Sequence, residues 1–248
     1  MPGSAENLSD ANFILNTAVA KELRDFVEAT QDAADFECAA AAWVKTTLNE
    51  HRRVIFNGNG YTEAWEVEAE RRGLPNRKCT PDAMVALKDP KNIKLMEEFG
   101  VLTRTEMLSR YEVEMEHYSK VLNIEARTML KVANKQLIPA VTSYMSDVAG
   151  TAATKMAVSE SISTRAEQKL LNQLSQYADE MSDAVDELQK VADEVSAMTD
   201  ETAKAHAYHD VVIPAMAKLR ASADAAEEIC REDYWPLPCY SRLLYYTE

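Results

Sequence analysis

The chain has 248 residues and a formal net charge of −14, which comes from 27 Lys and Arg against 41 Asp and Glu. This acidity argues against nucleic acid and anionic membrane surfaces as partners, because both are bound through clustered Lys and Arg. The apolar fraction of 46% is typical of a globular protein, and no apolar run approaches the ~18 residues that can span a bilayer.

The glycine and cysteine content indicates the fold class and the compartment of the protein. Six glycines, at positions 3, 58, 60, 73, 100 and 150, leave long uninterrupted stretches that favour an all-α protein. The four cysteines form no Cys-x-x-Cys pair, and nothing resembles a signal peptide. We therefore expect a cytoplasmic protein.

The first part of the chain predicts two amphipathic helices after a polar start. Residues 1–10 are polar, and we expect them to be a linker or to mark a cut within a longer protein. Apolar residues such as Ile14 and Phe26 then recur on one face and predict a helix over about 11–30. A second helix is expected over about 33–52.

The segment Asn57-Gly58-Asn59-Gly60 predicts a tight turn after a short apolar run that ends at Phe56. Asn and Gly tolerate the positive φ angles of such turns, so at least one of these glycines is expected to have a positive φ. Thr62 can then cap a helix that ends at Gly73, a residue suited to the left-handed position after a helix.

Two functions remain open for this turn. Its backbone amides can approach a phosphate, as those of glycine-rich turns do, although no P-loop lysine or dinucleotide fingerprint accompanies it. The alternative, which we favour, is a packing role with Tyr61 and Trp65 as anchors.

Threonine, aspartate and proline mark the starts of the next helices. Thr80 and Asp89 each precede a proline, the arrangement of an N-cap residue before the first helical position, and Gly100 can close the helix that begins at Pro90. Thr103 and Glu106 form a capping box that begins a long helix. That helix is expected to continue to about residue 148, with a bend near Pro139.

Past Gly150, where we expect a turn, the apolar spacing becomes that of helices packing along narrow seams. With a further turn near Asp200, the two seams predict an antiparallel three-helix bundle. The first seam comprises Leu171, Leu174, Ala178, Met181, Val185, Leu188, Ala192 and Val195, and the second comprises Val212, Met216, Leu219, Ala223, Ala226 and Cys230.

Two clusters with histidine have spacings that suit a metal. Glu114 and His117 lie three residues apart, as in di-iron bundles, but no second Glu-x-x-His follows. His206, His209 and Asp210 share a helix face, which suits zinc, yet no further Cys or His is near them in sequence. We interpret both clusters as solvated helix surface and expect no metal site.

The end of the chain carries more apolar surface than a free terminus normally does. We expect this tail to be docked, with Trp235 largely buried against residues 54–74 or against an adjacent subunit. The side chains concerned are Tyr234, Trp235, Leu237, Tyr240, Leu243, Leu244, Tyr245 and Tyr246.

Several segments along the chain have distinctive sequences, and their resemblance to a known family is the main indication of function. They are residues 12–23, 53–61, 68–70, 72–76, 109–112, 124–126, 137–140 and 234–240, with Trp65, Leu243 and Leu244. Together they resemble the C-terminal region of type III glutamine synthetases, the long bacterial form of that enzyme. The Asn-Gly-Asn-Gly turn and the terminal Trp-Pro-x-Pro are the most specific pieces.

This resemblance implies part of an enzyme rather than a complete one. The family's catalytic, ATP-binding and metal-binding residues would lie before Asn12, so no catalytic, cofactor-binding or metal-binding residue is expected here. The parent enzyme would ligate ammonia to glutamate with ATP and Mg²⁺, in the glutamine biosynthesis of nitrogen metabolism, and would be a double-ring homo-oligomer. This chain would be inactive alone and would serve in structure and assembly.

We therefore expect an all-α fold in four parts. They are residues 1–30, the last helix of a catalytic region; 31–102, a short-helix region with the turn; 103–233, an elongated antiparallel three-helix bundle; and 234–248, a docked aromatic and proline tail. Structural roles are expected of Asn57, Gly58, Asn59, Gly60, Tyr61, Trp65 and Trp235. The alternative is a standalone helical scaffold or protein-binding module, which a stop codon and ribosome-binding site directly before Met1 would favour.

Overall fold

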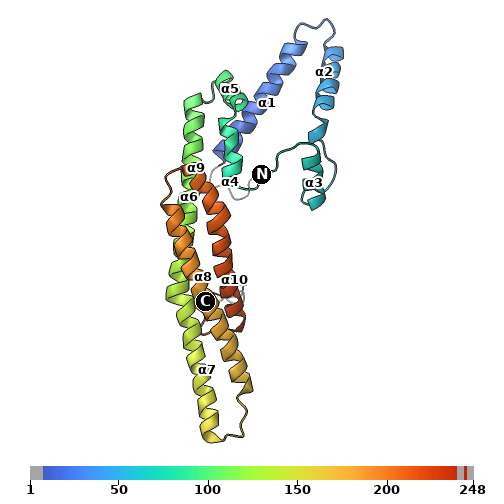
Figure 1. Ribbon diagram of the computed structural model, residues 1–248. Helices are drawn as coiled ribbons and strands as arrows, with labels where there is room; N and C mark the ends of the chain where they lie inside the picture. The colour runs from blue at the N-terminus through green and yellow to red at the C-terminus, as the bar shows by residue number, and fades with distance from the viewer. Residues whose placement is uncertain (1–7, 239–242, 245–248) are drawn as a thin grey trace. The chain divides into compact units, whose positions relative to one another are not determined.

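The computed structural model describes residues 8–238 and 243–244, and every regular element within these ranges is helical (Figure 1). The all-α fold expected from the sequence is confirmed. The chain divides into two compact units, Met1–Val113 and Glu114–Glu248, hereafter unit 1 and unit 2. The finer division at residues 30, 102 and 233 stays a prediction.

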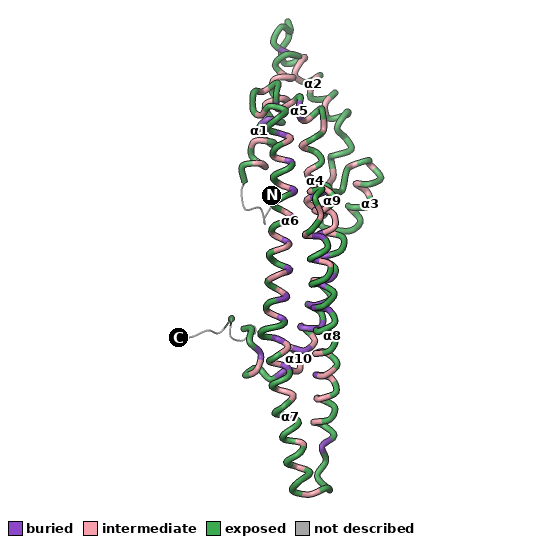
Figure 2. Tube along the Cα trace, turned by 60° about the vertical axis from the view of Figure 1, so that its left-hand side comes forward, coloured by how far each residue is buried: buried purple, intermediate pink, exposed green. Residues whose placement is uncertain are grey.

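Unit 1 begins with two amphipathic helices, α1 (Ser9–Thr30) and α2 (Phe36–Glu50). The helices pack against each other, and a short turn joins them. Asp35 ends the turn by capping α2, because its carboxylate accepts a hydrogen bond from the Cys38 backbone N–H at 3.0 Å. None of the residues of α2 is fully buried, so the pair leaves much of its surface open (Figure 2).

Two of the short helices that follow end at the glycines that the sequence predicts. The elements are a 3-10 turn (Arg52–Val54), α3 (Glu63–Arg71), α4 (Thr80–Met84), a second 3-10 turn (Val85–Lys88) and α5 (Pro90–Glu98). Gly73, at a φ of 69°, closes α3, with hydrogen bonds from its own N–H to the Glu70 carbonyl and from Leu74 N–H to the Ala69 carbonyl. Gly100, at a φ of 63°, closes α5 with the same pattern.

The starts of the helices follow the sequence with one correction. Asp89 caps α5 by accepting a backbone N–H at 2.9 Å. Thr103 and Glu106 form the expected capping box: the Glu106 carboxylate accepts the Thr103 N–H at 2.7 Å, and the Thr103 hydroxyl accepts the Glu106 N–H at 3.3 Å. The prediction that Thr80 caps its helix is wrong, because Cys79 is the N-cap and the proline takes the second helical position, where its missing N–H is also harmless.

Unit 2 consists of the remainder of a long helix and the helices that follow it. The elements are α6 (Arg104–Val132), a π-helical turn (Ala133–Leu137), α7 (Ile138–Val158), α8 (Arg165–Ser196), α9 (Glu201–Ala207), a second π-helical turn (Tyr208–Val212) and α10 (Ile213–Ile229). Figure 1 shows α8 running back beside α7 and α10 beside α8, and these two pairs make the main helix contacts of the unit.

The core of unit 2 follows the predicted seams. Leu174, Met181 and Leu188 of α8 are fully buried, and Leu219 and Ala226 of α10 are buried with them in one cluster. Figure 2 shows buried residues recurring along these helices. Apolar residues at this 3-4 spacing form a stripe along each helix. The helices pack together because the stripes are removed from water where they meet.

The π-helical turns lie directly before two Ile-Pro-Ala sequences, which contain Pro139 and Pro214. Proline lacks a backbone N–H and its ring clashes with the carbonyl four residues earlier, so a regular α-helix is disrupted there. A π-helical turn absorbs this disruption within a continuous helix. The irregularity near Pro139 was predicted from the sequence, and the one before Pro214 was missed.

The prediction of a turn at Gly150 is wrong. α7 continues through Gly150 to Val158, and the connection to α8 lies at residues 159–164. Glycine inside a helix costs only ~1 kcal/mol relative to alanine, so one glycine does not end a helix whose neighbours favour it. The polar stretch after Val158 supplies the turn instead.

Candidate functional site

Several exposed apolar side chains of unit 1 lie on α1. We call this surface the α1 apolar face and define it as Ile14, Leu15, Val19, Leu23 and Val27. Leu15 and Leu23 are 63% and 61% exposed, respectively, although both are large aliphatic side chains. Contiguous exposure of this kind is typical of a surface that another polypeptide covers.

A groove of about 340 Å³ adjoins this face. It is lined almost entirely by apolar atoms of Ala18, Val19, Leu23, Phe26 and Trp43, together with Glu22. The Phe26 ring meets the Trp43 ring edge-on at a centroid distance of 5.2 Å and meets Phe36 at 6.1 Å. These aromatic contacts join α1 to α2 and give the groove a defined wall.

The Asn-Gly-Asn-Gly segment packs differently from our prediction. Neither Gly58 nor Gly60 has a positive φ, so the expectation of a left-handed glycine is wrong. The tight feature is instead the approach of the Phe56 ring, which would lie 2.6 Å from a Cβ added at Gly58. The Asn59 side chain accepts a hydrogen bond from the Tyr61 N–H at 3.0 Å and closes the bend.

Trp65 and Tyr61 differ in their environment. The Trp65 ring stacks on Phe56 at a centroid distance of 4.1 Å and is half-buried. Tyr61 is fully exposed, so its expected role as an anchor is wrong. The Phe56 side chain occupies that role, because its ring stacks on Trp65 from the segment that follows the first 3-10 turn. Asn57 is exposed.

A cluster of arginines lies beside this aromatic stack. The Glu68 carboxylate accepts two hydrogen bonds from Arg71, both at 2.7 Å, and one from Arg72 at 2.5 Å. These bonds lower the pKa of Glu68 to about 2, and those from Arg71 have a larger effect than the one from Arg72. Arg72 also donates to the backbone carbonyls of Ile55 at 2.8 Å and Arg53 at 3.3 Å, which ties α3 to the preceding turn.

This cluster surrounds a pocket of about 360 Å³, which we call the arginine pocket. It is lined by Arg52, Arg53, Ile55, Arg71 and Arg72. This pocket was not predicted from the sequence, although the pairs Arg52-Arg53 and Arg71-Arg72 on either side of the turn were the available signal.

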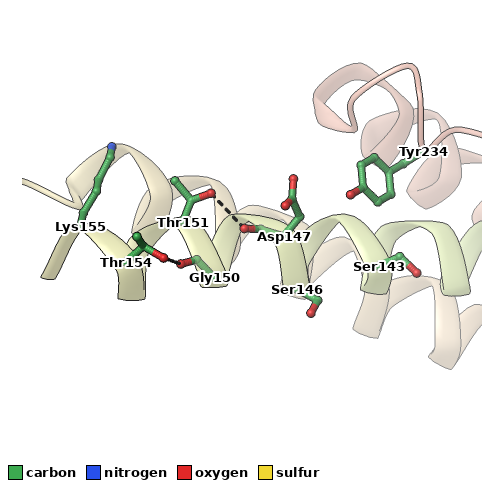
Figure 3. Close-up of a pocket in the computed structure, with 8 residues that line it drawn as sticks. All are labelled: Ser143, Ser146, Asp147, Gly150, Thr151, Thr154, Lys155 and Tyr234. Carbon is green, nitrogen blue, oxygen red and sulfur yellow. Dashed lines mark hydrogen bonds between the residues drawn. The ribbon is translucent and has the colours of Figure 1, made fainter. Parts of the chain in front are cut away.

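A shallow pocket of about 700 Å³ lies along α7 in unit 2 (Figure 3). The hydroxyls of Thr151 and Thr154 donate to the carbonyls of Asp147 and Gly150, so both serve the helix itself. Lys155 forms an ion pair outside the pocket, with a glutamate of α8. The polar groups therefore do not converge on a common point. The lining residues are Ser143, Ser146, Asp147, Gly150, Thr151, Thr154, Lys155 and Tyr234.

The burial of Trp235 is confirmed, at 6% exposure, but its expected location is wrong. It belongs to the core cluster of unit 2 rather than packing on residues 54–74, because the chain turns back directly after α10. The Tyr234 ring lies 5.3 Å from that of Tyr144 on α7.

The rest of the tail only partly fits the expectation of docking. Leu243 and Leu244 are exposed, which contradicts docking for these two side chains. Tyr240, Tyr245 and Tyr246 lie outside the described residues.

Glu114 and His117 lie on α6, whereas His206, His209 and Asp210 lie at the junction of α9 and the second π-helical turn. His209 Nδ1 lies 2.7 Å from an Asp210 carboxylate oxygen. Within residues 8–238 and 243–244, no three His, Cys, Asp or Glu side chains are placed to hold a metal ion. A search of the same residues finds no helix with the length and apolarity to cross a membrane.

Comparison with known proteins places these features in a family context. Residues 39–156 match the family model of the glutamine synthetase C-terminal domain. A glutamine synthetase of Butyrivibrio fibrisolvens is 35% identical over 202 residues, which cover 82% of this chain and 29% of that protein. A type-3 glutamine synthetase of Dictyostelium discoideum is 29% identical, and a glutamine synthetase of Bacteroides fragilis is 26% identical; each alignment covers 98% of this chain and 34% of the relative. The chain thus spans about a third of the length of these relatives.

Proposed function

We propose that the chain is the C-terminal helical portion of a type III glutamine synthetase, because residues 39–156 match the family model of the glutamine synthetase C-terminal domain. Its role is structural: it supports the parent enzyme and takes part in the assembly of a cytoplasmic homo-oligomer. The parent ligates ammonia to glutamate with ATP and Mg²⁺, and this portion contributes no catalytic residue.

The observation that carries this proposal is the α1 apolar face. Burial of an exposed leucine, isoleucine or valine side chain contributes roughly 1.5 to 3 kcal/mol, so the five residues of this face favour a covered state. About two thirds of each relative's length lies outside the region that matches this chain. That remainder is the natural source of the surface that covers the α1 apolar face.

A standalone scaffold or protein-binding module is the second candidate function. The groove lined by Val19, Leu23, Phe26 and Trp43 supports it, because a groove with apolar walls is also the kind of site in which an amphipathic helix docks. Under this alternative the occupant of the groove is an unrelated protein rather than another part of a glutamine synthetase.

Enzyme assays of the isolated 248-residue chain test the absence of catalytic residues. With ATP, Mg²⁺, glutamate and ammonia supplied, we expect no glutamine formation above a sample without protein. A glutamine synthetase related to this chain, assayed in parallel, is the positive control. Turnover by the isolated chain would contradict the proposal, since it would place catalytic groups within these residues.

A further inference from the structure

The arginine pocket stands out because positive charge is concentrated there in an otherwise acidic chain. Four arginines line it, and Glu68 is the carboxylate that pairs with two of them. The local sum of these five side chains is therefore +3, whereas the whole chain carries −14. Like charges held together without compensation are unfavourable, so this arrangement favours a bound anion.

Arg52 and Arg53 are the arginines that remain available to a ligand. Both are exposed, and the structure gives their guanidinium groups no ion pair or hydrogen bond to another described residue. Arg71 and Arg72, in contrast, are engaged by Glu68. The pocket thus combines two held guanidiniums with two that can turn toward an incoming anion.

Contacts of the Arg72 side chain also hold the pocket in a fixed arrangement. Arg72 donates to the carbonyls of Arg53 and Ile55, and its guanidinium carbon lies 5.6 Å from the centre of the Trp65 ring. These contacts fix the turn that carries Arg52 and Arg53 against α3. A site whose parts are fixed before binding loses less entropy when the ligand arrives.

We propose that the arginine pocket binds a small anion that carries at least two phosphate groups. Guanidinium groups are planar forks that pair bidentately with phosphate oxygens, and a diphosphate presents enough oxygens for several forks at once. The volume of about 360 Å³ and the local charge of +3 suit a compact, multiply charged ligand.

Inorganic pyrophosphate is the probe for the test, titrated into the 248-residue chain by calorimetry at low ionic strength, where screening is weak. We expect saturable binding at one site. The double variant Arg52→Ala/Arg53→Ala should weaken the affinity at least about tenfold, because charge-assisted hydrogen bonds are lost. The control Arg165→Ala/Arg220→Ala removes the same charge from exposed positions in unit 2 and should bind like the unaltered chain.

Three results would overturn the proposal. The first is no saturable binding of pyrophosphate to the unaltered chain. The second is equal weakening in both double variants, which would indicate a general charge effect. The third is equally tight binding of citrate, which carries similar charge on carboxylates and would remove the assignment to phosphate. Circular dichroism checks that the variants fold, and Arg53→Gln, which keeps most of the side chain but removes its charge, should also weaken binding.

Discussion

At the scale of single residues, Gly58 shows why the Asn-Gly-Asn-Gly segment has the composition it does. The sequence predicted a glycine with positive φ, but the structure shows a close approach between Gly58 and the Phe56 ring. Because Phe56 is stacked on Trp65, its ring is not free to move away from an added side chain. The requirement for glycine was therefore predictable, whereas its cause was not.

Replacement of Gly58 by alanine should destabilise unit 1. The new Cβ would lie 2.6 Å from Phe56 Cζ and would push the ring off Trp65, with a loss of about 1 kcal/mol, the contribution of an aromatic pair. Gly60→Ala is the matched control, since the nearest atom to its Cβ would be 3.9 Å away. Chemical denaturation measures both. Equal free energies of unfolding for the two variants would refute the packing role of Gly58.

Glu68 gives a second prediction, about pH. Its folded-state pKa of about 2 is below the ordinary value of 4.5, so its ion pairs with Arg71 and Arg72 stabilise the fold above pH 4.5. That stability is lost as the pH falls toward 2, because the unfolded chain takes up the proton first. The free energy of unfolding should therefore fall more between about pH 5 and about pH 3 in the unaltered chain than in Glu68→Gln.

The exposed neighbour Glu70, changed to glutamine, is the control for this pH effect. It lies on the same helix as Glu68 and should leave the pH dependence of the unaltered chain in place. If Glu68→Gln loses as much stability on acidification as the unaltered chain does, the Glu68 pairs contribute nothing to acid sensitivity.

At the scale of elements, the sequence predicts helix ends well where one side chain completes a local hydrogen-bond pattern. The capping box at Thr103 and the left-handed ends at Gly73 and Gly100 are of this kind. Gly150 was misassigned because the surrounding residues, rather than the glycine, decide whether a helix continues. The arginine pocket escaped prediction for a related reason: it exists only once Arg72 folds back onto the preceding turn.

Two glycines should respond to alanine in opposite ways. Gly150→Ala should stabilise α7 by about 1 kcal/mol, because the position is helical and no atom lies within 4 Å of the new Cβ. Gly73→Ala should destabilise unit 1 by about 1 kcal/mol, since a φ of 69° is unfavourable for alanine. Thermal unfolding monitored by circular dichroism distinguishes the two. A stability loss at Gly150 would show that its place within α7 is wrong.

At the scale of the whole molecule, the two units differ in how they bury apolar surface. Unit 2 has a continuous core that extends from α6 through α10 to Trp235. Unit 1 has a small core around Ile93, Met96 and Met107, while the α1 apolar face stays exposed. Sequence periodicity predicts an apolar face on a helix but not what covers it, so this difference required the structure.

The central claim, that the α1 apolar face is covered within a glutamine synthetase, is tested most directly by the assembly of the enzyme that carries this segment. Leu15→Glu/Val19→Glu places two carboxylates on the face, where burial of an unpaired charge is strongly unfavourable. The control Asn172→Glu/Gln176→Glu adds the same charge to exposed positions of α8. Sedimentation velocity should show a shift to smaller species for the first variant and an unchanged oligomer for the control. An intact oligomer in the first variant would contradict the claim.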